Sequence, residues 1–401
     1  MKVSRRFLAV LIAASAPLIL LTPAPAAKKA AANSRYLTYV GTYTTKTDSK
    51  GIYAYEFDAD TGKLTPKGVA AETRDPSWVA VHPSGKFLYA ANEAGQASTV
   101  SAFAIDAKTG KLALLNQLPS LGEDPCYLSF DKTGKYVFVA NYSSGTIAVF
   151  PILADGRLGE HTALVKDQGA TGPNKERQGG PHAHWIETSP DNRFALVADL
   201  GLDEVLIYRF DAKKGILSRN DPPLMTVPAL LASSWRGANV NPGAGPRHFV
   251  FHPQGKFGYV VNEMDATVMA FSYQRNNGTL SFLQTIATLP KGFSGRNDAA
   301  EIAVHPNGKF HYASNRGDES ITIFAIDPAK GTLTFVAHVL TGGKEPRHFA
   351  IDPSGKYLLA ENQLSNNLVV FKIDGATGGL RPTGQTVDVP SPVDIAFLPE
   401  D

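Results

Sequence analysis

The sequence has almost no cysteine, since Cys126 is the only one in 401 residues. A single thiol excludes an intramolecular disulfide and any metal cluster built from several cysteines, so the fold must be held by its core. Net charge is also scarce: it totals +2, with lysines and arginines scattered along the chain. Because nucleic-acid binding usually needs a concentrated basic surface, we expect no nucleic-acid partner.

Long apolar runs are absent except at the N-terminus. Lys2, Arg5 and Arg6 precede an uncharged apolar stretch over residues 7–21, and Ala-Pro-Ala at residues 24–26 offers a small-residue cleavage site. The stretch is too short to span a bilayer comfortably. The pattern is typical of a secretory signal peptide.

The export route stays open, because residues 4–8 (SRRFL) are similar to a twin-arginine signal that lacks its usual spacer. We expect a signal peptide over residues 1–27 and a short linker over residues 28–35. The mature protein is then periplasmic or secreted and has no membrane association after cleavage.

A repeated hairpin pattern organises the rest of the chain. Residues 82–92 (HPSGKFLYAAN) join a Pro-x-Gly turn to an aromatic-rich run that ends in a polar residue. Related copies occupy residues 130–141, 188–199, 251–262, 304–315 and 351–362. The copies recur about every 50 residues, which is the length of a propeller blade of four short strands.

The four strands of one unit can be assigned directly. Residues 77–81 and 87–92 flank the first Pro-x-Gly turn, residues 99–105 follow, and a turn leads into residues 112–118. We count this unit as blade one and number the later units in chain order. No helical periodicity appears outside the N-terminal segment.

The two ends of the chain decide the number of blades. Residues 36–41 read as a second strand with no first strand before it, and residues 391–397 read as a first strand with nothing after it. Joining them completes a seventh blade and removes the open sheet edges. We therefore predict one all-β domain over residues 36–401. It is a seven-bladed β-propeller with four antiparallel strands per blade, closed by N-terminal strands plus the C-terminal strand.

Aligning the copies on the turn separates structural positions from functional ones. The turn histidines His82, His252 and His305 recur, so we expect them to be structural. At the opposite face, where strand one begins and strand two ends, the residues do not repeat and are mostly polar. Blades three to six place these candidates there: His184, Arg247, His248, Glu263, Glu301, Arg316, Arg347 and His348, with His182 just upstream.

These candidates point to an anionic ligand. Ionised groups in a narrow channel must pair or meet a ligand, because uncompensated burial is costly. Three arginines against two glutamates favour a carboxylate- or phosphate-bearing molecule, which guanidinium groups match well. An ion-pair network that joins blades three to six is the alternative. His184 and Glu263 are the candidate acid/base pair.

A metal site has little support in the sequence. His182-Ala183-His184 would place two imidazoles on the same side of a strand, but no third ligand follows at a suitable spacing. We predict no metal and no cofactor.

Two insertions lengthen the repeat. They cover residues 168–180 and 221–245, are rich in Gly, Pro, Asn and Ser, and each precedes a first strand. Long loops of this kind are often functional, but surface decoration is equally compatible with the sequence.

Several motifs occur together in order along the chain. They are YVGTY at residues 39–43 with GIY at 51–53, GPNKERQGGPHAH at 172–184, GPRHF at 245–249 with VNE at 261–263, and NDAAEI at 297–302 with SNRG at 314–317. This set resembles the seven-bladed β-propeller lactonase family, which includes propeller-type 6-phosphogluconolactonases and fungal carboxy-muconate lactonising enzymes. Carried over by motif, the family's functional residues fall on His184, Arg247, Glu263 and Arg316. The resemblance implies no metal requirement.

The resemblance implies hydrolysis of a sugar lactone to the aldonic acid. We expect His184 or Glu263 to activate water while Arg247 and Arg316 stabilise the oxyanion. The expected substrate-binding residues are His182, His248, Glu301, Arg347 and His348. Of these, Arg347 and His348 could hold a phosphate or carboxylate group of the substrate.

The signal peptide complicates the choice of substrate. It would place the protein outside the cytoplasm, where 6-phosphogluconolactone is not made, so an unphosphorylated lactone such as gluconolactone is an expected variant. Two other functions stay open. One is a non-catalytic periplasmic propeller that binds an anionic sugar or a protein, and the other is a lactone-forming cycloisomerase that acts on a muconate-like diacid.

Overall fold

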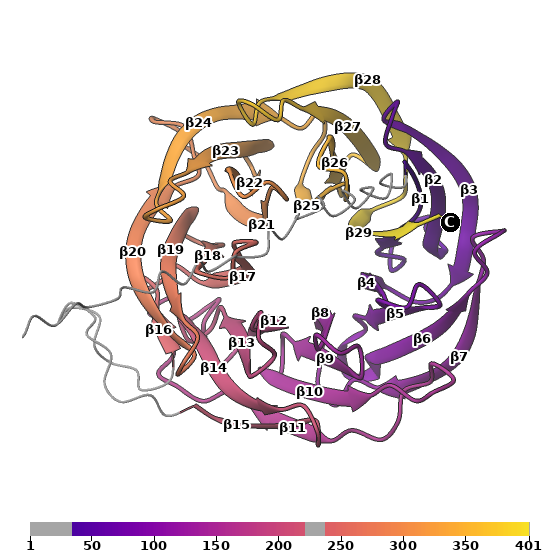
Figure 1. Ribbon diagram of the computed structural model, residues 1–401, viewed down its shortest axis with the longest axis horizontal. Helices are drawn as coiled ribbons and strands as arrows, with labels where there is room; N and C mark the ends of the chain where they lie inside the picture. Colours follow the sequence, from indigo (N-terminus) through magenta and orange to yellow (C-terminus); the bar gives the residue numbers. More distant parts are fainter. Residues whose placement is uncertain (1–33, 221–236, 401) are drawn as a thin grey trace, which may run out of the picture. The chain divides into compact units, whose positions relative to one another are not determined.

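The computed structural model describes residues 34–220 and 237–400. Its strands form seven antiparallel sheets arranged in a ring (Figure 1), and each sheet contains a continuous path of four strands. The predicted seven-bladed β-propeller is therefore confirmed. The predicted signal peptide, most of the predicted linker and residues 221–236 of the second insertion lie outside the described residues.

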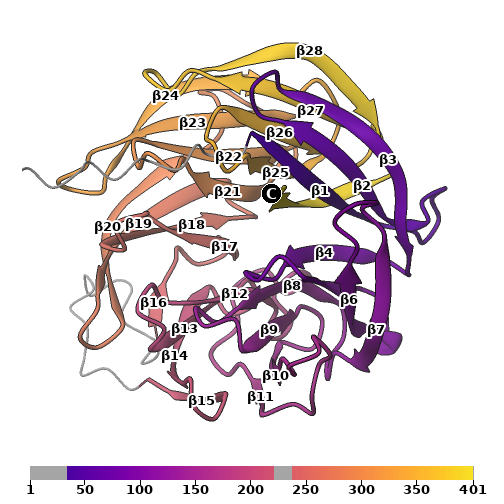
Figure 2. The ribbon, with the colours of Figure 1, turned by 45° about the vertical axis from the view of Figure 1, so that its right-hand side comes forward.

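In blades one to six the strands of the four-strand path follow one another in chain order from the channel outward; in Figure 2 this order is clearest for the blade of β25 to β28. Blade one is β4 (Pro76–Val81), β5 (Phe87–Asn92), β6 (Thr99–Ile105) and β7 (Leu112–Pro119). Blade two is β8 (Pro125–Phe130), β9 (Tyr136–Asn141), β10 (Thr146–Pro151) and β11 (Ala163–Lys166). Blade three is β12 (Ala183–Thr188), β13 (Phe194–Asp199), β14 (Glu204–Asp211) and β15 (Ile216–Arg219), with β16 (Gly237–Asn239) also paired to β14.

The next three blades repeat this order. Blade four is β17 (Pro246–Phe251), β18 (Phe257–Asn262), β19 (Thr267–Gln274) and β20 (Thr279–Ala287). Blade five is β21 (Asp298–Val304), β22 (Phe310–Arg316), β23 (Ser320–Ile326) and β24 (Leu333–Leu340). Blade six is β25 (Pro346–Ile351), β26 (Tyr357–Asn362), β27 (Asn367–Ile373) and β28 (Leu380–Asp388).

Blade seven combines both ends of the described chain. It consists of β29 (Pro392–Pro399), β1 (Arg35–Thr42), β2 (Gly51–Asp58) and β3 (Lys63–Glu72). In Figure 1 the yellow β29 lies beside the indigo β1, and the register pairs Tyr36 with Pro399 and Val40 with Ile395. The predicted closure is confirmed. It hydrogen-bonds strand edges that would otherwise be free to pair with another chain.

Helix is nearly absent from the part of the chain that the structure describes. There the one helical element is the short 3₁₀ turn η1 (Gly95–Ala97). Over residues 34–220 and 237–400, no helix has the length and apolar character needed to cross a membrane.

Apolar residues on the first strands pack the blades against one another. The predicted packing column is buried in all seven blades: Val79, Leu128, Ile186, Phe249, Ile302, Phe349 and Ile395. Because side chains alternate along a strand, one face of each first strand is committed to this core.

The turn histidines join neighbouring blades, as predicted. Nε2 of His82, His252 and His305 lies 2.8, 2.9 and 2.8 Å from a glycine carbonyl oxygen in the next blade's turn. Those glycines have φ near +70°, and a Cβ on any of them would lie within 3 Å of the histidine ring. The hydrogen bond between blades therefore needs a glycine at the acceptor position, because any side chain there would clash with the imidazole that donates the bond.

The opposite face has a feature that regular strands would not provide. In every blade the pairing of strand one with strand two shifts register at the entrance of strand one, as a β-bulge does. In blade four the shift lies between Pro246 and His248, so Arg247 is the extra residue. A bulge interrupts the alternation of side chains, and Arg247 and His248 both contact blade five. Because of the bulge, two successive residues can both direct their side chains to the channel side of the blade.

Candidate active site

Three arginines converge on Glu263 at this face. Arg247 Nε lies 3.1 Å and Arg316 Nη2 lies 2.9 Å from Glu263 Oε2, while Arg177 Nη2 pairs with Oε1. These side chains come from the first insertion and from blades four and five, and we call Arg177, Arg247, Arg316 and Glu263 the arginine cluster. The structure thus brings the predicted residues Arg247, Glu263 and Arg316 together.

The arginines of the cluster set the charge state of Glu263. Burial alone would raise the pKa of the Glu263 carboxyl, but Arg316 and Arg247 outweigh burial and hold the pKa well below its usual range. Burial, together with the neighbouring arginines Arg316 and Arg347, lowers the pKa of Arg247 to about 10. Glu263 is therefore ionised at neutral pH, and as a strongly stabilised carboxylate it is a weak proton acceptor.

The first insertion holds Arg177 in place through its buried neighbour. Gln178 is fully buried, and its Nε2 donates to Leu200 O at 2.9 Å and to Asp203 Oδ1 at 2.7 Å. Asp203 also accepts bonds from Gly243 N and Gly245 N, in the segment that leads to Arg247. One carboxylate thus ties both insertions to the arginine cluster.

His184 is buried close to this cluster. Its Nδ1 lies 3.6 Å from Cys126 Sγ, and among the described residues no hydrogen bond to another residue engages Nε2. Burial and the positive charge of Arg247 lower the pKa of the imidazole well below its usual value. His184 is consequently neutral at neutral pH and can accept a proton at Nε2.

His182 and His184 flank the same aromatic ring. The His182 ring stacks on Tyr142 with 4.7 Å between centroids, and the His184 ring meets Tyr142 edge-on at 5.5 Å. His182 Nδ1 donates to the carbonyl oxygen of Tyr142 at 3.0 Å. Tyr142, at the end of β9, therefore belongs to the site together with both histidines.

A second cluster lies along the channel and combines acids with imidazoles. His248 Nδ1 lies 2.8 Å from Glu301 Oε2. His348 has Glu361 Oε1 3.2 Å from Nδ1, and Asp394 Oδ1 and Glu301 Oε2 at 3.4 and 3.5 Å from Nε2. We call His248, His348, Glu301, Glu361 and Asp394 the acid–imidazole cluster.

Burial governs the charges of the acid–imidazole cluster. It raises the pKa of Glu301 and of Asp394 to about 7, and it raises the pKa of Glu361 well above its usual value. Glu361 therefore keeps its proton at neutral pH, and Glu301 and Asp394 are partly protonated, which lowers the cost of placing three carboxyls together. His348 has carboxyl groups beside both of its ring nitrogens, which is a poor environment for an anionic ligand. The expected role of His348, which was to hold a phosphate or carboxylate group of the substrate beside Arg347, does not fit these surroundings.

Trp78 closes the channel next to this cluster. It comes from blade one, but its ring contacts Tyr127 of blade two at 4.1 Å, His248 of blade four at 5.4 Å and His348 of blade six at 5.3 Å. A side chain that reaches three other blades must occupy the middle of the channel. The site is thus bounded on one side by an indole.

Arg347 makes no ion pair with any carboxylate of the described residues. Its guanidinium lies 5.4 Å from the centroid of the Tyr43 ring, whose hydroxyl donates to Glu93 Oε2 at 2.7 Å. Among the described residues, no hydrogen bond or ion pair engages the Arg347 side chain. Burial would lower the pKa of Arg347, but neighbouring groups that include the Glu93 carboxylate outweigh burial and raise that pKa, so Arg347 is charged and available to an anion.

Metal ligation finds no support in the described geometry. Within residues 34–220 and 237–400, no three His, Cys, Asp or Glu side chains are arranged to hold a metal ion. The imidazoles of His248 and His348 are occupied by carboxyl partners, and His182 bonds to a backbone carbonyl.

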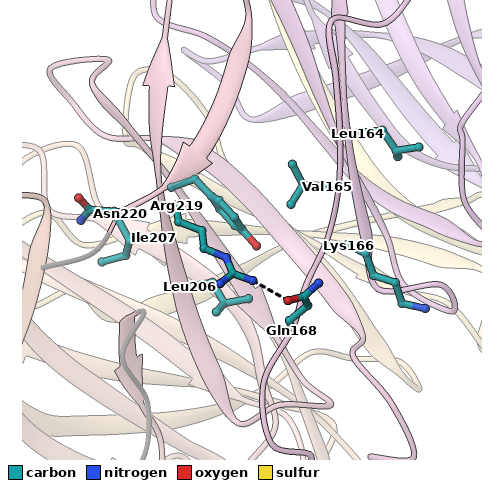
Figure 3. A pocket seen from close by; sticks show the side chains of 9 residues that line it. Leu164, Val165, Lys166, Gln168, Leu206, Ile207, Arg219 and Asn220 are labelled. Carbon is teal, nitrogen blue, oxygen red and sulfur yellow. Dashed lines mark hydrogen bonds between the residues drawn. The ribbon is translucent and has the colours of Figure 1, made fainter.

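Cavities elsewhere do not compete with this site. A cavity of about 240 Å³ lies between blades two and three (Figure 3), where Arg219 Nη2 donates to Gln168 Oε1 at 2.5 Å across one edge. Its lining comes from strands β11, β14 and β15 and adjoining residues, away from the channel, and includes none of the predicted site residues. A polar cavity of about 390 Å³ has one member of the arginine cluster, Arg177, in its lining, together with Asp298 and Met264 among others.

The sequence analysis missed Arg177 and Tyr142. Arg177 lies within an insertion that had been left open between function and decoration, and its position in the GPNKERQGG motif was the available signal. Tyr142 directly follows strand two of its blade, and Glu263 holds the same aligned position in blade four. The residue type at this position differs from blade to blade, and this lack of repetition could have identified Tyr142 as a candidate site residue.

The chain matches known proteins over almost all of its described length. The profile of the family described as "Lactonase, 7-bladed beta-propeller" matches residues 37–397. A 6-phosphogluconolactonase of Bacillus subtilis is 35% identical over 365 residues, which is 91% of this chain and 99% of the relative.

Solved structures give the same picture. A putative 6-phosphogluconolactonase from Bacteroides fragilis superposes with a TM-score of 0.80 at 38% identity, covering 91% of this chain and 98% of the other. A periplasmic gluconolactonase of Pseudomonas aeruginosa superposes with a TM-score of 0.82 at 34% identity, covering 91% and 99%.

Proposed function

The chain belongs to the seven-bladed β-propeller lactonase family, and from this we propose that it hydrolyses a sugar lactone to the aldonic acid. Two relatives that align along nearly their whole length are named for lactone opening, one as a 6-phosphogluconolactonase and one as a periplasmic gluconolactonase. The observation that carries the proposal is a neutral imidazole, His184, beside three guanidinium groups that share one carboxylate.

In this mechanism His184 is the base that activates water. Nε2 of the neutral imidazole accepts a proton as the water oxygen attacks the lactone carbonyl. Glu263 is unsuited to that role, because its carboxylate is stabilised by Arg177, Arg247 and Arg316. Its part is to hold the three guanidinium groups in place.

The arginine cluster stabilises the oxyanion. Each guanidinium has five N–H donors, and the contacts of Arg247 and Arg316 with Glu263 and with backbone carbonyls leave some of them unused. Asp298 and Glu345 lie farther from the cluster than Glu263 does, at 3.6 Å from Arg177 Nη1 and 3.7 Å from Arg316 Nη1. The developing negative charge on the carbonyl oxygen can therefore meet guanidinium donors that Glu263 holds in place in a buried site.

Arg347 is the anchor for an anionic or electron-rich group of the substrate. Its charge has no carboxylate partner, whereas His348 faces acids. A guanidinium can bind a carboxylate or a phosphate group alike. The signal-like N-terminal sequence favours an unphosphorylated lactone, opened in the periplasm or outside the cell.

A panel of lactones tests the proposal. δ-Gluconolactone, 6-phosphogluconolactone and unrelated δ- and γ-lactones are given to the protein without residues 1–27, and acid release is followed with a pH indicator. Spontaneous opening is subtracted. We expect at least one sugar lactone to open well above background, with kcat/KM higher for gluconolactone than for its 6-phosphate. If no lactone opens faster than its background, the protein is a binding propeller rather than a lactonase.

Two variants tie the activity to the site. His184→Ala is expected to lower kcat by about 100-fold or more, because the base is removed. The control is His161→Ala, which changes an exposed histidine and should leave kcat unchanged.

A further inference from the structure

Lactone opening needs an acid as well as a base. Once the tetrahedral intermediate forms, the ring oxygen departs as an alkoxide unless a group protonates it. The need for such a group rests on the proposed lactonase function. Glu263 is an ionised carboxylate and carries no proton to donate. The three guanidinium groups of the arginine cluster are held by Glu263 and are assigned to the oxyanion.

Tyr142 has the position that such an acid requires. Its side chain is half-buried and its ring packs against both His182 and His184. Its hydroxyl lies near the guanidinium of Arg177, which pairs with Glu263, and the phenol and the guanidinium shift each other's pKa. The phenol and the imidazole of His184 therefore stand side by side at the arginine cluster.

The hydroxyl hydrogen of Tyr142 is free to be donated. Because a guanidinium has only N–H donors, Arg177 beside the phenol can donate to the phenolic oxygen but cannot accept its hydrogen. Among the described residues, no acceptor for the Tyr142 hydroxyl hydrogen is found. Burial and the negative charge of Glu263 also raise the pKa of the phenol, which keeps it protonated at neutral pH.

We propose that Tyr142 is the general acid that protonates the departing ring oxygen, in partnership with His184 as the general base. Water loses one proton to His184 Nε2 while its oxygen bonds to the carbonyl carbon, and the C=O electron pair moves to the oxyanion. As the oxyanion collapses, the bond from carbon to the ring oxygen breaks and that oxygen takes the phenolic hydrogen. The product is the open hydroxy acid.

The cycle closes without any further reactant. The reaction leaves a Tyr142 phenolate and a protonated His184, whose ring centroids are 5.5 Å apart. The proton passes from the imidazolium to the phenolate, directly or through the next water to enter, so both groups return to their starting states. Arg177 stabilises the phenolate while it exists, because its guanidinium already lies near the hydroxyl.

The variant Tyr142→Phe tests this role, since it removes only the hydroxyl and keeps the ring that packs on the two histidines. With the lactone that the wild-type protein opens fastest, we expect kcat to fall about 100-fold while KM stays within threefold. The control Tyr312→Phe removes a hydroxyl that bonds Gly378 O between blades, and it should leave kcat unchanged.

Oxygen exchange distinguishes an acid from a residue that merely positions Arg177. In ¹⁸O-labelled water, an intermediate whose ring oxygen cannot leave returns to lactone and carries label into the unreacted carbonyl. We expect Tyr142→Phe to raise the ratio of enzymatic exchange to hydrolysis at least tenfold, whereas His184→Ala lowers both processes together.

Two results would overturn the proposal: Tyr142→Phe with kcat within threefold of wild type, or a lower kcat with an unchanged exchange ratio. Both require a wild-type protein that opens the lactone. Inactivity of the wild type on every lactone would instead refute the proposed function itself.

Discussion

Histidines at the two faces of the propeller have different surroundings. At the Pro-x-Gly turns, His82, His252 and His305 make the same bond to the next blade. At the opposite face the histidines have different neighbours. His184 lies beside the thiol of Cys126, His248 lies beside the carboxyl of Glu301, and His348 lies beside three carboxyl groups. Repetition marks the positions that join the blades, and its loss marks the positions that are available for chemistry. Changes at the turn face should therefore alter stability, and changes at the opposite face should alter turnover.

The largest effect is expected for Glu263→Gln. Loss of this carboxylate leaves Arg177, Arg247 and Arg316 without their shared counter-charge, so their donors lose position and turnover should fall by about 1,000-fold. Steady-state kinetics on the best lactone measures this, with thermal unfolding to show that the protein remains folded. Glu187→Gln, which changes a carboxyl outside the arginine cluster, is the matched control. Near-normal turnover of Glu263→Gln would show that the cluster is structural.

At the turn end of blade five, His311 should make the protein sensitive to acid. It is fully buried, neither of its ring nitrogens has a hydrogen-bond partner, and burial lowers its pKa to about 3. Because the unfolded chain binds the proton near pH 6.5, stability is lost as the pH falls from 6.5 towards 3, by about 3 kcal/mol at pH 4. Urea unfolding at pH 7 and pH 4 should show that His311→Phe removes this loss. The same loss in His311→Phe as in the wild type would assign it to another group, and His161→Phe should not change it.

A smaller loss of turnover is expected for Gln178→Ala. Gln178 anchors the insertion that presents Arg177, so its removal should lower kcat about tenfold through displacement of that guanidinium. Lys175→Ala changes an exposed residue of the same insertion and should have little effect. Equal kcat values for the two variants would mean that Arg177 does not depend on this anchor.

The smallest effect is expected for His305→Ala. The variant loses the bond to Gly355 O and leaves a buried carbonyl unpaired, so the free energy of unfolding should fall by about 1–2 kcal/mol. Denaturant unfolding measures this change, and kcat should be unaffected. His82→Ala breaks the equivalent bond at a half-buried position, so it should cost less. A loss of kcat in His305→Ala would remove the distinction between the two faces.

Much of the fold was predictable because each blade encodes its own turn. The recurring Pro-x-Gly hairpin gave the period, and the unpaired strands at residues 36–41 and 391–397 gave the closure, both of which the structure confirms. The β-bulges at the entrance of every first strand were not predicted, because a bulge changes hydrogen-bond register without a distinct residue pattern.

The sequence by itself determined which positions break the repeat, and these include Arg247, Glu263 and Arg316 of the arginine cluster. Only the tertiary structure decided which charges meet: Arg177 joins Glu263 from an insertion, and His348 faces acids instead of an anion. The physical reason is that a blade's strands follow from local turns and alternation, whereas the partners of a channel side chain come from other blades, tens of residues away. The pKa values of His184 and Glu263 depend on burial and on distances between side chains of different blades. These quantities cannot be read from a pattern along the chain.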